Sequence, residues 1–434
     1  MKKIYIDCTS TYNTNFLTGI QRVVRNVVEQ ATRLNIQGTT VIPLIWEGNA
    51  FYQVDMIPAL VQTVTNNLGV DTRRQKHIFL LSQDNDRAFL AIKNALKHCC
   101  PVIFHSLKRI YRKIKSKLQQ LINFKQAVHF ENGDVLFLLD AIWDIQNWEG
   151  LEKAKLSGAK IIYAVYDLIP ITHPDFCGEE HINAFNEYYQ HALVLADGFF
   201  AISQTVRDEV RQYVLQYPID RHICFDYFYL GADFTKQPSD EIAVSREHIR
   251  QFFQKESSVY LIVSTIEPRK NHAYLLDAFE QLWHDDQNVA LCIVGKVGWQ
   301  VTQLIERLTN HPEKNNRLVV WHDINDDELM YCYQHSKCLV FPSIIEGFGL
   351  PIVEAFKHQL PVIASDINIH REIGGDLAMY VDLSNAQSLV NRVKDIEQHG
   401  FPEEHRPPEN YEWLSWEDAT KILLKKLTID FHTG

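Results

Sequence analysis

The fold of this chain is decided by the stretch FPSIIEGFGLPIVEA, which occupies Phe341–Ala355. An apolar run at Cys338–Phe341 has the length of a buried strand, and Leu350–His358 has the apolar spacing of a helix. Gly347 and Gly349 permit a tight backbone turn between the two. We therefore expect strand, turn and helix in succession, which is the repeating unit of an α/β domain.

The same alternation of apolar runs and amphipathic stretches extends along most of the 434 residues. Most of the runs are continuously apolar, as in parallel strands that are covered on both faces. They predict strands at Lys3–Ile6, Val41–Leu44, Val135–Leu139, Lys160–Val165, Gly198–Ala201, Tyr260–Ser264, Ala290–Val294, Arg317–Trp321, Cys338–Phe341 and Pro361–Ala364. Helices are expected between them, for example at Gly19–Leu34 and Ala273–Trp283. The pattern predicts doubly wound α/β domains.

Two polar, turn-rich stretches divide the chain. The first, at residues 232–245, separates two series of strands, and the second, at residues 400–410, precedes a final helix expected at Trp416–Leu427. The total length suits two domains of roughly 200 residues each. The expected units are an N-terminal domain, a C-terminal domain and a helical segment, at residues 1–238, 239–408 and 409–434.

The glycine turn ahead of the helix predicts an anion site, because exposed amides and the positive end of a helix suit a diphosphate. Glu346 and Glu354 flank this turn. Two carboxylates would repel phosphate alone, so we expect them to accept hydrogen bonds from sugar hydroxyls. The alternative is an ordinary turn with solvated glutamates. The residues expected to bind substrate here are Gly347, Phe348, Gly349 and Leu350.

Two adjacent cations, Arg269 and Lys270, follow the strand expected at Tyr260–Ser264. The carboxyl end of such a strand is where an open α/β sheet places its ligand. Arg grips phosphate through two donors and Lys supplies a compact charge. The pair is therefore expected to neutralise a departing diphosphate, with a solvated basic turn as the alternative.

Two turns of the N-terminal half also carry candidate residues. Gly19, before the first long helix, would let the backbone approach a phosphate, although a plain loop-to-helix turn fits equally. Asp167 and His173 follow the apolar strand Lys160–Val165. Both are titratable and suit the orientation of an acceptor hydroxyl or the relay of a proton. The alternative for His173 is that it caps a turn.

Composition excludes several classes of protein. The net charge of -11 argues against nucleic-acid binding. The eight cysteines form no Cys-x-x-Cys pair and no zinc-type spacing, which is typical of reduced thiols. No window reaches the ~20 apolar residues of a membrane span, and the first residues already read as a strand rather than a secretory leader. Asp84-Asn85-Asp86 has metal-binding spacing but lies far from the phosphate motifs, so we do not expect it to bind a metal.

One segment is basic, although the chain as a whole carries a net negative charge. Residues 87–130 contain ten Lys and Arg and no Asp or Glu. Within it, apolar residues recur at helical spacing over residues 107–122, which predicts a basic amphipathic helix. Three interpretations stand, namely a surface helix with a solvated face, peripheral contact with an anionic membrane, or binding of an acidic polysaccharide.

Together these motifs resemble family 4 of the retaining glycosyltransferases. Glu346 and Glu354, in EGFGLPIVE, match its E-x7-E signature, and EPRKN at residues 267–271 and LCIVGK at residues 291–296 match its C-terminal domain. The segments DLIPITHP and GIQR, at residues 167–174 and 19–22, are similar to members that build bacterial surface polysaccharides, mannosyltransferases among them. The match is specific over residues 260–382 and looser in the N-terminal half.

The resemblance implies the GT-B fold, in which two Rossmann-like doubly wound domains face each other across a cleft and the last helix crosses back to the first domain. It implies that Glu346 contacts the donor sugar and Glu354 the ribose hydroxyls. Arg269 and Lys270 would hold the diphosphate, with Gly19 approaching it from the opposite domain. Tyr166 stands where many relatives have His, which leaves the acceptor-side role open between Asp167 and His173.

The implied activity is transfer of a hexose or deoxyhexose, with retention, from a nucleotide-diphosphate sugar to a glycan or lipid-linked glycan acceptor. GDP-mannose is the favoured donor, and O-antigen or capsule synthesis the favoured setting. No metal or other cofactor is implied, and the expected location is the cytoplasm, at the inner face of the membrane. Two alternatives stand. One is a nucleotide-sugar epimerase of the same fold, and the other is a non-catalytic sugar-binding subunit of a polysaccharide assembly complex.

Overall fold

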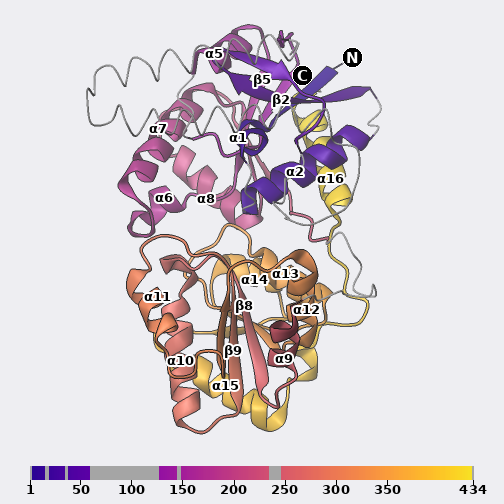
Figure 1. Cartoon of the computed structure of the whole chain (residues 1–434). Helices are drawn as coiled ribbons and strands as arrows, with labels where there is room; N and C mark the ends of the chain where they lie inside the picture. The colour runs from indigo at the N-terminus through magenta and orange to yellow at the C-terminus, as the bar shows by residue number, and fades with distance from the viewer. Residues whose placement is uncertain are drawn as a thin grey trace, which may run out of the picture.

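The computed structural model of the protein describes residues 2–14, 19–34, 38–58, 127–143, 148–233 and 246–432. These residues form two α/β units, each built on its own sheet, and the units face each other in Figure 1. Helices cover both faces of each sheet. The arrangement confirms the expected pair of doubly wound domains.

The N-terminal unit has a seven-stranded sheet of order β3-β2-β1-β4-β5-β6-β7. Its strands are β1 (Lys2–Asp7), β2 (Thr39–Glu47), β3 (Ala50–Gln53), β4 (Val135–Leu138), β5 (Lys160–Val165), β6 (Gly198–Ala201) and β7 (Cys224–Tyr227). Neighbouring strands are parallel except β2 and β3, which form an antiparallel hairpin. Its helices are α1 (Thr9–Asn13), α2 (Gly19–Arg33), α5 (Trp148–Leu156), α6 (Ile169–Thr172), α7 (Glu179–Leu195) and α8 (Gln204–Val214).

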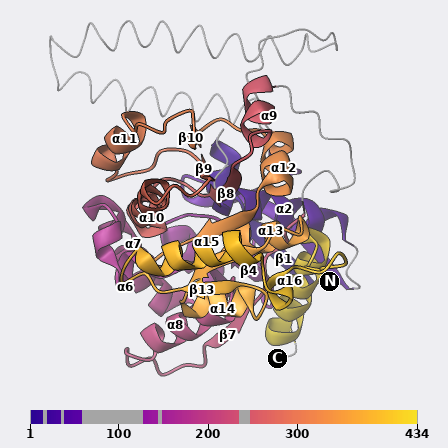
Figure 2. The same cartoon turned by 90° about the horizontal axis from the view of Figure 1, so that it is seen from below.

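The C-terminal unit has a six-stranded, wholly parallel sheet of order β10-β9-β8-β11-β12-β13. Its strands are β8 (Ser258–Val263), β9 (Val289–Val294), β10 (Leu318–Trp321), β11 (Cys338–Phe341), β12 (Val362–Ser365) and β13 (Met379–Val381). Its helices are α9 (Glu247–Phe253), α10 (His272–His284), α11 (Thr302–Thr309), α12 (Asp326–His335), α13 (Leu350–Lys357), α14 (Asn368–Gly374) and α15 (Gln387–His399). On one face α10 packs beside α15 (Figure 2).

The alternation of side chains along each strand explains the two helical layers. In β8, Leu261 faces the core under α13, whereas Tyr260 and Ile262 face the core under α10. Because both faces are covered, a strand such as β9 is buried at every residue. This double burial is why the strands read as continuous apolar runs in the sequence.

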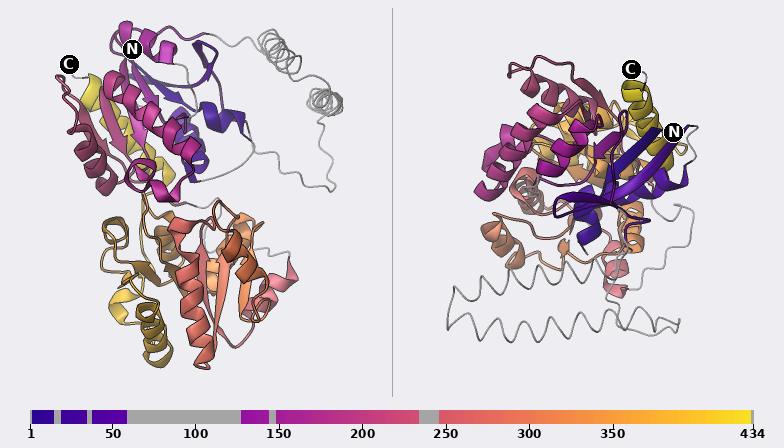
Figure 3. Two further views of the ribbon diagram at one scale, coloured as in Figure 1. Left: turned by 90° about the vertical axis from the view of Figure 1, so that its left-hand side faces the viewer. Right: turned by 90° about the horizontal axis from the view of Figure 1, so that it is seen from above.

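The last helix, α16 (Trp416–His432), returns to the N-terminal unit and packs against α2 (Figures 1 and 3). The indole N–H of Trp413, just before it, donates to the carbonyl of Leu230 at 2.8 Å. Near its end, Phe431 lies with its ring centre 6.0 Å from that of Phe200 in β6. The segment that ends in α16 therefore returns from the C-terminal unit to the N-terminal unit.

Every strand expected from the sequence is present, with ends that differ by up to three residues. Three further strands, β3, β7 and β13, were not predicted, because each is short and only partly buried. The proposed boundary at residues 238 and 239 lies outside the described residues. So do the expected basic helix at residues 107–122 and the Asp84-Asn85-Asp86 motif.

Candidate active site

The glycine turn between β11 and α13 approaches the N-terminal unit closely. A Cβ added to Gly347 would lie 2.0 Å from the carbonyl oxygen of Tyr166, so no larger residue fits there without movement. The hydroxyl of Ser203 also donates to the carbonyl of Gly347 at 2.9 Å. Gly349, which ends the turn, has a positive φ of 95°, a conformation that favours glycine. The turn with Phe348 and Leu350 therefore lies at the interface of the two units.

A buried cluster of charges lies beside this turn. One oxygen of the Glu346 carboxylate accepts a hydrogen bond from Arg269 Nη1 at 2.9 Å, and the other accepts from Lys270 Nζ. Arg269 also pairs with Glu267 at 2.7 Å, and its carbonyl accepts the N–H of Ile344 at 2.8 Å. The sequence prediction that Glu346 and the two cations belong to one site agrees with this geometry.

The charge states of the cluster follow from its burial. Burial raises the pKa of Glu346, but the charges of Lys270 and Arg269 outweigh this and lower that pKa to about 2. Burial and the neighbouring Arg269 lower the pKa of Lys270. Burial also raises the pKa of Glu267, against the opposing charge of Arg269. Glu346 is therefore ionised throughout the physiological range and is a permanent hydrogen-bond acceptor.

Glu354 lies inside the first turns of α13 and is 2 % exposed. It accepts hydrogen bonds from Tyr333 Oη at 2.8 Å and from Arg22 Nη1, which comes from α2 of the other unit. Gly19 begins the same helix, and no atom lies within 4 Å of the position where its Cβ would stand. Arg22 belongs to the GIQR segment, but the sequence alone indicates no role for it. Only the fold brings its side chain to Glu354.

A cavity lies between the two units, next to the charge cluster. It encloses about 750 Å³, including the part open to solvent, and Asp167 and Arg269 both line it. Asp167 accepts the N–H of Ile169 at 3.0 Å. Burial raises the pKa of Asp167, and the charge of Arg269 opposes this. Asp167 therefore lies near Arg269.

His173 has a different position. It ends α6 with its side chain exposed, its ring stacked on Phe176 at 6.3 Å and its Nδ1 2.9 Å from the hydroxyl of Thr172. His173 is not among the described residues that line the cavity, whereas His181 and Asp140 are. Asp140 directly follows the apolar strand expected at Val135–Leu139, which is the signal by which it is recognisable in the sequence.

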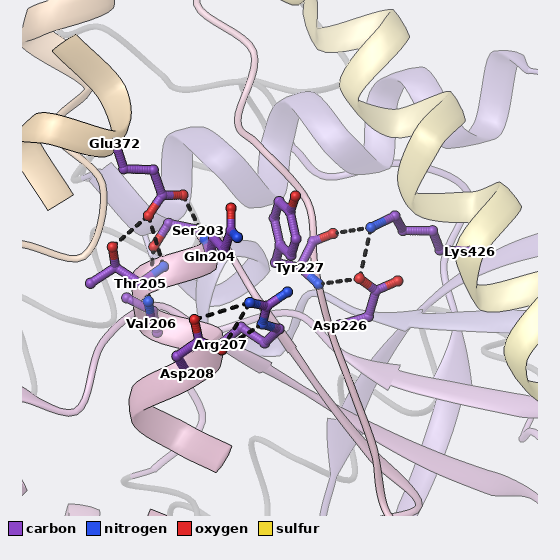
Figure 4. A network of polar contacts seen from close by, with 10 residues as sticks. All are labelled: Ser203, Gln204, Thr205, Val206, Arg207, Asp208, Asp226, Tyr227, Glu372 and Lys426. Carbon is purple, nitrogen blue, oxygen red and sulfur yellow. Dashed lines mark hydrogen bonds and ion pairs between the residues drawn. The ribbon is translucent and has the colours of Figure 1, made fainter. Parts of the chain in front are cut away.

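A second cross-unit contact involves the beginning of α8 (Figure 4). The carboxylate of Glu372, from α14, accepts the N–H groups of Gln204 and Thr205, each at 2.7 Å, and the hydroxyl of Thr205. A carboxylate of one unit thus satisfies the exposed amides at a helix N-terminus of the other. Figure 4 also shows Lys426 of α16 bound to Asp226 at 2.7 Å, which holds the last helix to β7.

No group of three or more potential metal ligands occurs in the part of the chain that the structure describes. Among the same residues, no helix combines the length and the apolar character needed to cross a membrane.

Two curated relatives are similar to this chain. A serotype-specific mannosyltransferase, WbdA of Escherichia coli, is 32% identical over 318 residues, which cover 70% of this chain and 38% of the relative. The O-antigen chain mannosyltransferase RfbU of Salmonella typhimurium is 25% identical over 246 residues, or 56% of this chain and 67% of the relative. The chain thus spans well under half the length of WbdA.

The fold is shared with solved structures. The sucrose-phosphate synthase of Thermosynechococcus elongatus superposes with a TM-score of 0.60 over 100% of both chains, at 15% sequence identity. That likeness shows the two-domain GT-B architecture. Residues 245–412, which include the charge cluster and the glycine turn, match the family described as glycosyl transferases group 1. This match assigns residues 245–412 to the group 1 glycosyltransferases, and the similarity to WbdA and RfbU extends over a larger part of the chain.

Proposed function

We propose that this chain is a retaining glycosyltransferase that moves a hexose or deoxyhexose from a nucleotide-diphosphate sugar to a glycan or lipid-linked glycan. The observation that carries the proposal is the buried contact of Glu346 with Arg269 and Lys270 beside the glycine turn. Mannose from GDP-mannose is the favoured donor group, because WbdA and RfbU are named mannosyltransferases. Their names also favour a role in bacterial surface-polysaccharide synthesis.

The cluster suits stabilisation of a departing diphosphate. Arg269 and Lys270 are already desolvated and held in place before substrate arrives, so little reorganisation is needed as negative charge develops. The amides from Phe348 to Leu350, at the N-terminus of α13, add partial positive charge. Glu346, ionised at all physiological pH values, accepts hydrogen bonds from hydroxyls of the donor sugar. Glu354 accepts hydrogen bonds from the ribose hydroxyls.

The transfer step balances without an added reactant. The acceptor oxygen forms a bond to the anomeric carbon on the face from which the diphosphate leaves, as the bond from that carbon to the phosphate oxygen breaks. The electron pair of the broken bond stays on the phosphate oxygen, which takes the acceptor proton. We assign Asp167 to orienting the acceptor hydroxyl, because it lines the cavity beside Arg269 whereas His173 is exposed.

We further propose that no metal takes part, since the two cations supply the positive charge that this step needs. The proposed location is the cytoplasm, with residues 107–122, which lie outside the described part of the chain, in contact with the anionic inner face of the membrane.

The direct test of the activity is an NMR assay of sugar transfer without added metal. The protein is incubated with GDP-mannose, GDP-fucose, UDP-glucose or UDP-N-acetylglucosamine, each with a mannose oligosaccharide as acceptor. We expect a new glycosidic linkage with the same anomeric configuration as the donor sugar. It should form with donors of one nucleotide base only. An inverted linkage, or interconversion of donor sugars without transfer, would contradict it. The latter result would favour the epimerase alternative.

A further inference from the structure

The carboxylate of Glu354 is covered from the side of the N-terminal unit. Tyr333 of α12 donates its hydroxyl to one oxygen at 2.8 Å, and Arg22 of α2 donates Nη1 to the other. Tyr333 belongs to the same unit as Glu354, so Arg22 is the partner that crosses the boundary, where α2 faces α12 and α13 (Figure 1). With both partners in place Glu354 is 2 % exposed, so its oxygens are closed to a ligand.

Access, rather than acceptor capacity, is what Glu354 lacks. A carboxylate has about four acceptor positions, and Tyr333 and Arg22 each take one of them. A ribose reaches the others only if one of these side chains moves aside. Tyr333 is fully buried, and its ring is stacked on His358 with 5.5 Å between the ring centres. The side chain of Arg22 is 24% exposed. Arg22 is therefore the partner that can leave.

The backbone of Arg22 is fixed, so its side chain has to make the movement. Helix α2 packs against α16 and buries one apolar face in the core of the N-terminal unit, namely Val23, Val24, Val27 and Val28. An arginine side chain has several rotatable bonds and loses much rotamer freedom when it is held in one geometry. The guanidinium of Arg22 can therefore withdraw from Glu354 while the helix stays in place.

Withdrawal of Arg22 has a cost, because the ion pair is shielded from water. Burial lowers the pKa of Arg22, but the charge of Glu354 outweighs this and raises it. When such a pair separates, the buried carboxylate is left without its cation. Ribose hydroxyls are neutral donors, which form weaker hydrogen bonds to a carboxylate than a guanidinium does. Arg22 should therefore weaken the binding of a ligand that needs this carboxylate.

Resting on the function proposed above, we infer that Arg22 is a latch that competes with the ribose of the donor nucleotide for Glu354. In its closed position the latch joins the two units and covers the carboxylate. Binding of the nucleotide requires the guanidinium to withdraw, after which Tyr333 and the ribose share Glu354. The latch thus lowers the affinity for the nucleotide and couples its binding to the loss of an ion pair between the units.

The test is calorimetric titration of the wild type, Arg22→Met and Arg22→Lys with GDP, UDP and the 2′,3′-dideoxy form of each. The dideoxy nucleotides lack the hydroxyls that would reach Glu354, so they do not compete with Arg22. We expect Arg22→Met to bind one of the two diphosphates about fivefold more tightly than the wild type, or better, with no gain for its dideoxy form. Arg22→Lys keeps the positive charge and should stay within about twofold of the wild type.

A matched control comes from the same helix as Glu354. Lys357 of α13 pairs at 2.9 Å with Asp233, the last described residue of the N-terminal unit, and its side chain is 22% exposed against 24% for Arg22. Lys357→Met removes a similar contact between the units without touching Glu354, so it should bind the nucleotides as the wild type does. Glu354→Gln in the Arg22→Met background should abolish the gain, because the ribose then has no carboxylate to bind.

Unchanged or weaker binding of the diphosphate by Arg22→Met would overturn the inference. An equal gain in Lys357→Met, or with the dideoxy form, would also overturn it, because the effect would then come from loosening of the units. Circular dichroism checks that each variant is folded, and Arg22→Gln, with the same expected gain, replaces Arg22→Met if that variant is not.

The two proposals fail in different ways. Binding of neither GDP nor UDP, by the wild type and by Arg22→Met alike, contradicts the proposed donor site. A wild type that binds one of them, with no gain in Arg22→Met, contradicts the latch alone.

Discussion

Arg22 of the N-terminal unit and Glu354 of the C-terminal unit form an ion pair across the interface. The Glu354 side chain is 3% exposed and that of Arg22 24%, so water screens the pair little. The Tyr333 hydroxyl donates to the other oxygen of the same carboxylate. The residue that the sequence assigns to ribose thus also joins the two units, and a bound ribose would have to share this carboxylate.

Arg22→Met should lower the free energy of unfolding by about 2 kcal/mol, because it leaves Glu354 buried without its cation. This loss is smaller than is usual for breaking a buried ion pair, because Arg22 is partly exposed. Glu354→Gln in the same background should recover much of the loss. A double-mutant cycle on thermal unfolding measures this coupling, and purely additive effects would show that the pair contributes nothing.

Replacement of Gly347 should abolish transfer while leaving each unit folded. In Gly347→Ala the new methyl group meets the carbonyl of Tyr166, so the turn and the N-terminal unit must separate. We expect at least a hundredfold loss of transfer with little change in the far-ultraviolet circular dichroism. Gly178→Ala is the control, since no atom lies within 4 Å of its Cβ position. Full activity of Gly347→Ala would mean that this close approach is not required.

Loss of the carboxylate at the beginning of α8 should weaken the interface. Glu372→Gln keeps the shape of the side chain but removes the charge that the helix N-terminus favours, which is worth ~1 kcal/mol. The expected result is a lower thermal midpoint. Asp208→Asn, in the exposed first turns of the same helix, should change it less. Equal midpoints for wild type and Glu372→Gln would argue against an energetic role for this contact.

Asp7 should make stability fall with rising pH. Burial and the charge of Asp140 raise its pKa in the folded protein to about 8, above the ordinary value of 3.8, so the folded state binds more protons than the unfolded state between these values. Stability from this group is present at low pH and is lost as the pH rises toward 8. Asp7→Asn, neutral at all pH values, should therefore raise the thermal midpoint more at pH 8 than at pH 5. The reverse order would contradict an uncharged Asp7.

The sequence was sufficient to predict that Glu346, Arg269 and Lys270 lie together. Glu346, Arg269 and Lys270 each follow an apolar strand, and β8 and β11 are neighbours in the sheet, so their carboxyl ends bring the three together. The alternation of apolar runs and amphipathic stretches was equally sufficient to predict the doubly wound architecture. Strands that are buried on both faces are continuously apolar and are therefore easy to recognise.

The contacts between the two units could not be predicted from the sequence alone. Arg22 and Glu354 are 332 positions apart, and Glu372 and Gln204 are 168 positions apart, so no local pattern links them. Asp140 belongs with Thr11 only because β1 and β4 pair in the sheet. The sequence places His173 near the end of a strand, but it does not show that the short helix α6 leaves this side chain exposed.

We propose that the cluster of Glu346, Arg269 and Lys270 binds a nucleotide-diphosphate sugar. Thermal unfolding without added metal, against a panel of nucleoside diphosphates and nucleotide sugars, tests it most directly, because a ligand bound only by the folded protein raises the midpoint. We expect a rise of several degrees with one base only, guanine favoured, and a much smaller rise in Lys270→Ala. No shift with any nucleotide, or an undiminished shift in Lys270→Ala, would contradict it.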